Sequence, residues 1–78
     1  MVKKSELTFE IVEHIATIEE FGSGYTRELN LVSWNGGEPK YDIRNWNADH
    51  TKPSSGITLF DYELEKIAKA YKKHKKAK

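Results

Sequence analysis

The sequence predicts an α+β fold in which four antiparallel β-strands precede one C-terminal helix. Strand-like segments occupy residues 8–20, 25–34 and 39–46, and short turns rich in Gly and Asn separate them. Apolar residues then recur at helical spacing beyond residue 59. The 78 residues have the length of a single domain, so we expect residues 1–78 to form one unit, with fraying at 1–7 and 75–78.

The first strand carries apolar side chains on both parities, which predicts packing on both of its faces. The glycines of residues 21–24 end it in a turn. Asn35-Gly36-Gly37-Glu38 has the composition of a hairpin loop. The third strand opens with Pro39, whose missing N–H is tolerated at the first position of a strand.

A four-residue loop at 35–38 sets the expected register between the second and third strands. Trp34 then pairs with Pro39, and Val32 with Tyr41. One face gathers Val32, Trp34, Tyr41 and Ile43, and the other gathers Arg27, Leu29, Leu31, Lys40, Arg44 and Trp46. A slip of one residue would move these sets to opposite faces, because side chains alternate along a strand.

The C-terminal part predicts a polar loop at 47–55, a short fourth strand at 56–58 and a helix. Thr58 is the expected N-cap, with Asp61 at N3 near the positive helix end. Phe60, Leu64, Ile67 and Tyr71 recur at i, i+4, i+7 and i+11 and form one apolar stripe.

The small size predicts a thin core, because a domain of this length buries only about 60% of its unfolded surface. The chain has no cysteine, so neither disulfides nor a Cys/His zinc site can reinforce it. Oligomerisation is the remaining support. We therefore expect a homodimer whose interface contains Phe60, Leu64, Ile67 and Tyr71.

The net charge of +1 hides an asymmetry. Residues 1–65 carry six basic and twelve acidic side chains, a net charge of −6, whereas residues 66–78 carry seven lysines and no acid. Bulk charge therefore does not mark the body as a nucleic-acid binder, and a site there must be a local patch. The lysine run could contact phosphates or simply be solvated.

The face expected to hold Arg27, Lys40 and Arg44 around Trp46 is the best candidate site. Cations pair with phosphates and an aromatic ring stacks on unpaired bases, a combination suited to single strands. No element looks able to enter a duplex groove. From the pattern alone, a structural role for Trp46 is the favoured alternative.

Other chemistry has little support in the sequence. His14 could stack on a base or contact a phosphate, but a single strand histidine is more often structural. Asp49 and His50 are adjacent but lack further metal ligands. No nucleophile motif or phosphate-binding glycine loop occurs, so we expect no enzyme, cofactor, metal or small-molecule substrate. No apolar stretch is long enough for a membrane span or signal peptide, which predicts a cytoplasmic protein that could associate with the nucleoid.

The ordered set Asp42-Ile43-Arg44, Trp46, Asp49, Lys52-Pro53 and Gly56-Ile57-Thr58-Leu59 resembles the C-terminal domain of the single-stranded-DNA-binding transcriptional coactivators called positive cofactor four. It is most similar to their small bacterial YdbC-type relatives. The resemblance spans residues 8–71. It implies a curved four-stranded sheet, a helix-mediated homodimer and basic grooves for single strands. Carried over by position, the nucleic-acid-binding residues are Arg27, Lys40, Arg44, Trp46 and Lys52.

The resemblance thus favours a homodimeric single-stranded-DNA-binding protein related to transcription, with RNA as the alternative ligand and little sequence specificity. The eukaryotic coactivators carry a Ser- and Lys-rich regulatory region before this domain, and only residues 1–7 precede the first expected strand here. The rival hypothesis is a small dimeric protein-interaction module that binds no nucleic acid, which the acidic body favours.

Overall fold

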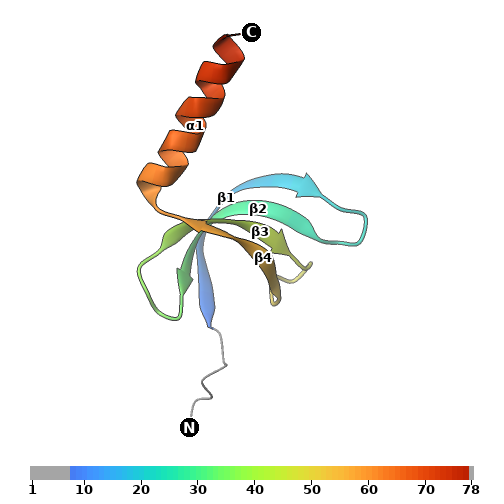
Figure 1. Ribbon diagram of the computed structural model, residues 1–78. Coiled ribbons are helices and arrows are strands. Elements are labelled where there is room, and N and C mark those ends of the chain that lie inside the picture. The colour runs from blue at the N-terminus through green and yellow to red at the C-terminus, as the bar shows by residue number, and fades with distance from the viewer. Residues whose placement is uncertain (1–7, 78) are drawn as a thin grey trace.

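The computed structural model describes residues 8–77 as one antiparallel sheet followed by one helix (Figure 1). The strands are β1 (Phe9–Glu20), β2 (Thr26–Trp34), β3 (Lys40–Trp46) and β4 (Pro53–Leu59), and the helix α1 is Asp61–Lys76. The strands lie side by side in chain order. The predicted fold class is confirmed. The fraying expected at residues 1–7 falls outside the described residues, and α1 continues to Lys76.

The expected register between β2 and β3 is wrong by one residue. Val32 pairs with Lys40, and Leu31 with Tyr41. The cause lies in the turn, which closes through a hydrogen bond of 2.9 Å from the Gly37 N–H to the Trp34 carbonyl. Asn35 and Gly36 supply its two positive φ angles, 53° and 75°, the pattern of a two-residue hairpin turn. This turn alone would pair Val32 with Pro39, so one further residue is inserted before β3 and Val32 pairs with Lys40.

Three irregularities bend β1 along its pairing with β2. They fall between Ile11 and Glu13, between His14 and Ala16, and between Thr17 and Glu19. Each irregularity inserts one apolar residue into β1. The inserted residues are Val12, Ile15 and Ile18, and their exposed fractions are 46%, 43% and 50%. The apolar side chains on both parities thus reflect bulges, which shift the alternation by one residue each time. The prediction that β1 packs on both faces is not met within the single chain, since residues 12–20 are exposed.

The sheet has two distinct faces, because cross-strand partners share a face. The inner face is formed by Phe9, Ile11 and His14 of β1, Glu28, Asn30, Val32 and Trp34 of β2, and Lys40, Asp42, Arg44 and Trp46 of β3. The helix face carries Ile15, Leu29 and Tyr41 and looks toward α1. Trp34 and Trp46 therefore share a face, and Arg27 lies on the opposite one.

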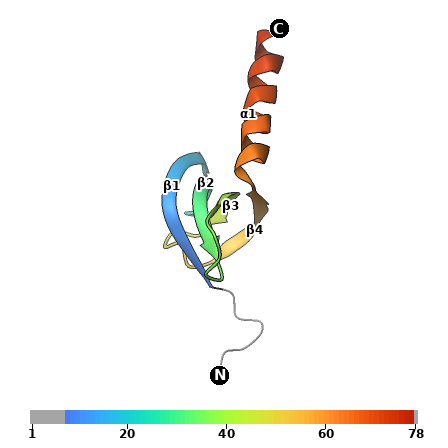
Figure 2. The same cartoon turned by 90° about the vertical axis from the view of Figure 1, so that its left-hand side faces the viewer.

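The helix begins later than the sequence predicts. Phe60 is the N-cap, and its backbone N–H donates to the Glu63 carboxylate at N3 over 2.8 Å. Thr58 belongs to β4 instead, where it pairs with Asp42 of β3, and its hydroxyl donates to the Asp42 carboxylate over 2.9 Å. Strand β4 also starts at Pro53, earlier than the expected residue 56. From this start α1 projects away from the sheet, and none of its described side chains is buried (Figures 1 and 2).

Candidate nucleic-acid interface on the inner face

A charged cluster at the β3–β4 side of the inner face is built on Asp42, which is fully buried. Arg44, two residues along the same strand, donates to both Asp42 oxygens over 2.6 and 2.8 Å and to the Ser54 carbonyl over 2.7 Å. Its guanidinium carbon lies 4.6 Å from the centroid of the Trp34 ring. Arg44 therefore forms a bidentate ion pair and stacks on an indole at the same time.

A second cluster is built on Glu28 of β2, which is 4% exposed. Thr26 and Asn30 donate to its two carboxylate oxygens over 2.6 and 3.0 Å. His50 Nε2 lies 2.8 Å from Oε2, and His14 Nδ1 lies 3.4 Å from Oε1. Two histidines from different segments of the chain thus converge on one buried carboxylate.

The hydrogen bonds around Glu28 decide its charge. Burial raises the pKa of the Glu28 carboxyl, but the hydrogen bonds from Thr26, Asn30 and His50 and the charge of His50 outweigh it. The pKa of Glu28 consequently lies below its ordinary value, and the group is a carboxylate at neutral pH. A carboxylate only accepts hydrogen bonds, so His50 donates from Nε2.

The His14 ring is held in the same way. Asn30 uses its amide N–H toward Glu28, so its oxygen accepts the hydrogen bond of 2.7 Å from His14 Nδ1. The opposite ring nitrogen of His14 lies 3.2 Å from the Thr17 hydroxyl. The His14 side chain is nevertheless 49% exposed. Its ring is therefore fixed in orientation while half of its surface faces solvent.

His50 owes its position to a folded loop between β3 and β4. Its φ of 59° is in the left-handed region, and its N–H bonds the Asn47 carbonyl over 3.0 Å. Asn47 and Thr51 both bond the Asp49 carboxylate, which lowers the pKa of Asp49 chiefly through the Thr51 hydroxyl. This loop returns the chain so that the His50 imidazole lies over the sheet.

Trp46 is fully buried and belongs to the core of the inner face. Its ring centroid lies 5.2 Å from that of Phe9 and 5.7 Å from that of His50. Stacking of a base on Trp46, as predicted from the sequence, would therefore require one of these rings to move. Trp34 is half-buried, with Phe9 at 5.8 Å and Arg44 over its ring. Neither indole N–H finds an acceptor in the described part of the chain.

The remaining residues of the predicted site are dispersed. Lys40 is exposed at the start of β3 on the inner face, with its ammonium 5.5 Å from the Phe60 ring centroid. Lys52 is exposed in the loop before β4. Arg27 is on the helix face, where it bonds Asn45 over 2.9 Å. The structure thus brings Lys40 and Arg44 onto one face and leaves Arg27 on the other.

The sequence did not identify Glu28 as a site residue, and it indicated His50 only as a weak candidate metal ligand. One signal for the two buried clusters was present, namely polar residues two apart on predicted strands, as in Glu28 with Asn30 and Asp42 with Arg44. Such spacing places both side chains on one face. Within residues 8–77, no group of three or more His, Cys, Asp or Glu side chains is placed to hold a metal ion.

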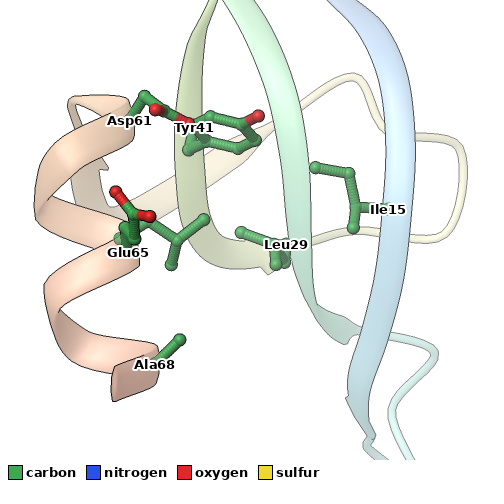
Figure 3. A pocket seen from close by; sticks show the side chains of 7 residues that line it. Ile15, Leu29, Tyr41, Asp61, Glu65 and Ala68 are labelled. Carbon is green, nitrogen blue, oxygen red and sulfur yellow. The ribbon is translucent and has the colours of Figure 1, made fainter. Parts of the chain in front are cut away.

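The residues predicted for dimerisation lie on α1 and at its N-cap, Phe60. A hollow of about 270 Å³ lies between α1 and the sheet, and Leu64 is among the residues that line it. Figure 3 shows Ile15, Leu29 and Tyr41 on the sheet side of this hollow and Ala68 on the helix side. Phe60, Ile67 and Tyr71 are 51%, 52% and 61% exposed. The apolar stripe of α1 is therefore only partly covered by its own sheet. No helix in the described residues is long and apolar enough to cross a membrane.

Two comparisons with known proteins bear on identity. The chain is 36% identical over 63 residues to an uncharacterized protein of Treponema pallidum (strain Nichols), covering 81% of this chain and 74% of that protein. The sequence model of the family described as Transcriptional Coactivator p15 (PC4) matches residues 21–70, which include β2, β3, β4 and most of α1. The chain therefore belongs to the Transcriptional Coactivator p15 (PC4) family.

Proposed function

We propose that the protein binds single-stranded DNA across the inner face of its sheet, in a role related to transcription. Membership of a coactivator family whose members bind single strands supports this function. The observation that carries it for this chain is the helix-free inner face, where Lys40 and the Arg44–Trp34 stack lie together. Cations beside aromatic rings suit an unpaired, flexible strand.

The contacts favour base stacking over dense phosphate pairing. Asp42 already neutralises Arg44, and Glu28 adds a second carboxylate to the same face. Lys40 is left as an exposed cation, joined by Lys52 in the neighbouring loop. The salt dependence of binding should therefore be modest, because few counterions are released per strand. Little base readout is expected, since stacking tolerates every base.

The experiment is a titration of matched single-stranded and duplex oligonucleotides at two salt concentrations. Tighter binding of the single strand, weakened by salt, is the expected result. Equal or tighter binding of the duplex contradicts the proposal. Absence of binding to either form supports the rival function, a dimeric protein-interaction module, which the net charge of −6 on residues 1–65 favours.

We also propose that the working form is a homodimer. The three bulge residues of β1 and the exposed stripe of α1 are apolar surface in need of a cover, and the hollow between them is lined by Ile15, Leu29 and Leu64. A second copy presents the same apolar groups, so a two-fold arrangement could cover both sets at once. Light scattering at micromolar concentration tests it, with a folded monomer as the contrary result.

A further inference from the structure

We propose that the hollow between His14 and His50 is a subsite for one nucleobase of the bound strand, an inference that rests on the proposed function. This hollow has a volume of about 300 Å³ and is lined by Ile11, His14, Glu28 and His50. It lies on the inner face, next to the buried ring of Trp46. Neither histidine belongs to the residues that the family resemblance assigns to binding.

On this face, the exposed aromatic rings are better placed to stack on a base than the buried aromatic rings are. Trp46 offers no surface, whereas the side chains of His14 and His50 are 49% and 38% exposed. Imidazole rings stack on unpaired bases in single-strand recognition. Ile11 adds an aliphatic wall, which suits the apolar faces of a base.

The two rings are also positioned before any strand arrives. Glu28 and Asn30 fix the hydrogen-bonded nitrogen of each imidazole, and both of these supports are buried. His50 keeps a left-handed backbone, which is uncommon outside glycine, to reach Glu28. Such preorganisation lowers the entropy that binding must overcome.

The charge in the lining of the hollow decides between a base and a phosphate. Glu28 is a carboxylate that lines the hollow and contacts a ring nitrogen of each histidine, and its charge repels a phosphodiester at close range. A neutral base meets no such repulsion, and its polarised N–H edge is attracted to the same charge. The subsite is therefore assigned to the base and not to the backbone of the strand.

The test uses the full chain with an oligothymidylate and a strand of the same length that carries abasic sites. The double variant His14→Ala/His50→Ala should bind oligothymidylate about 5- to 150-fold more weakly, the range expected for lost base stacking. Its affinity for the abasic strand and its salt slope should stay at wild-type values. His74→Ala, in the last turn of α1, is the matched control and should bind both strands normally.

Three outcomes overturn the subsite. The double variant could bind oligothymidylate as tightly as wild type, or it could lose affinity equally for both strands, or its salt slope could fall, which would indicate a phosphate contact. Failure of the wild-type protein to bind any strand would instead remove the proposed function itself, and the subsite with it. A circular-dichroism melt of each variant excludes unfolding as the cause.

Two further measurements keep the proposal open to refutation if the double variant does not fold. His14→Phe retains an aromatic ring without the bond to Asn30 and should bind better than His14→Ala. In NMR spectra of the wild-type chain, the imidazole protons of His14 and His50 should move upfield on adding oligothymidylate, because a stacked base shields them. Those of His74 should not move. A bound strand that leaves the first two unmoved refutes base stacking.

Discussion

The guanidinium of Arg44 covers the ring of Trp34 at 4.6 Å. Because Asp42 and the Ser54 carbonyl hold the same guanidinium from its edge, the stack is rigid and its outer surface is a flat cation. The Arg44 side chain is 15% exposed and Trp34 is half-buried, so part of the pair is open to an approaching base, and guanidinium planes are stacking surfaces in their own right. Arg44 and Trp34 therefore contribute both to the stability of the fold and to the proposed binding surface of the inner face.

Loss of Arg44 should damage the fold as well as binding. Arg44→Ala leaves the buried Asp42 without its ion pair, which typically costs about 3–5 kcal/mol of unfolding free energy. Replacing both partners in Asp42→Asn/Arg44→Met should recover more than half of that loss. Denaturant unfolding of wild type and the two variants measures it, and a double variant no more stable than Arg44→Ala would contradict the coupling.

Trp46→Ala should lower the unfolding free energy by about 3–5 kcal/mol, because the ring is fully buried against Phe9 and His50. Trp34→Ala should cost less, since that ring is half-buried. Urea midpoints with unchanged slopes check the comparison. A stable Trp46→Ala protein that loses only strand binding would restore the stacking role predicted from the sequence.

Lys40→Ala should reduce the salt slope of strand binding by about one charge. Its stability should change by no more than about 0.5 kcal/mol, because the side chain is exposed. Arg27→Ala is the control, since Arg27 lies on the helix face and should leave the slope unchanged. The reverse result, a slope change with Arg27 alone, would place the strand on the helix face.

Glu28→Gln should destabilise the protein at neutral pH by about 1–3 kcal/mol, because its amide N–H₂ would face the donors that now bond the carboxylate. Since folding lowers the pKa of Glu28, the carboxylate stabilises the fold above its unfolded pKa, and this contribution is lost as the pH falls through the folded pKa. The difference from wild type should therefore shrink below about pH 4.5.

Unfolding curves of wild type and Glu28→Gln at pH 7 and at successively lower pH measure this change. Glu13→Gln is the control, because Glu13 is exposed on β1. A stability difference that stays constant as the pH falls would show that the Glu28 carboxylate does not stabilise the fold through its charge.

Ile67→Asp should dissociate the proposed homodimer without unfolding the protomer. Ile67 is 52% exposed in the single chain, so a charge there is costly only when a second copy covers it. Tyr62→Asp makes the same charge change at a 58% exposed position on another side of α1 and should stay dimeric. Sedimentation analysis separates the two. A dimeric Ile67→Asp protein would move the interface elsewhere.

The order and bounds of the first three strands were predictable, because turn residues punctuate periodic segments and these signals are local. The faces were not. Parity between β2 and β3 depended on whether an even or an odd number of residues joins the paired positions: a four-residue loop is even, whereas seven residues separate the paired Val32 and Lys40. The bulges at Val12, Ile15 and Ile18 are equally hidden, because an inserted apolar residue looks like a strand buried on two sides.

The candidate site was predictable only in part. Lys40 and Arg44 came together as expected, since they lie on one strand at even spacing. The Glu28 cluster joins β1, β2 and the loop before β4, so it depends on tertiary contacts and on a left-handed His50. The spacing of Glu28 and Asn30 indicates only that they share a face, and local sequence patterns carry no signal for the approach of His14 and His50 to Glu28.

The irregular pairing of β1 also limits how this protein can assemble. An outer strand with regular spacing is a template on which further copies can add, and such growth ends in fibres. Here every third residue from Val12 to Ile18 interrupts the regular pairing of β1. These bulges disfavour extension of the hydrogen-bond ladder at the β1 edge, so contacts of another copy with this strand are favoured through its side chains.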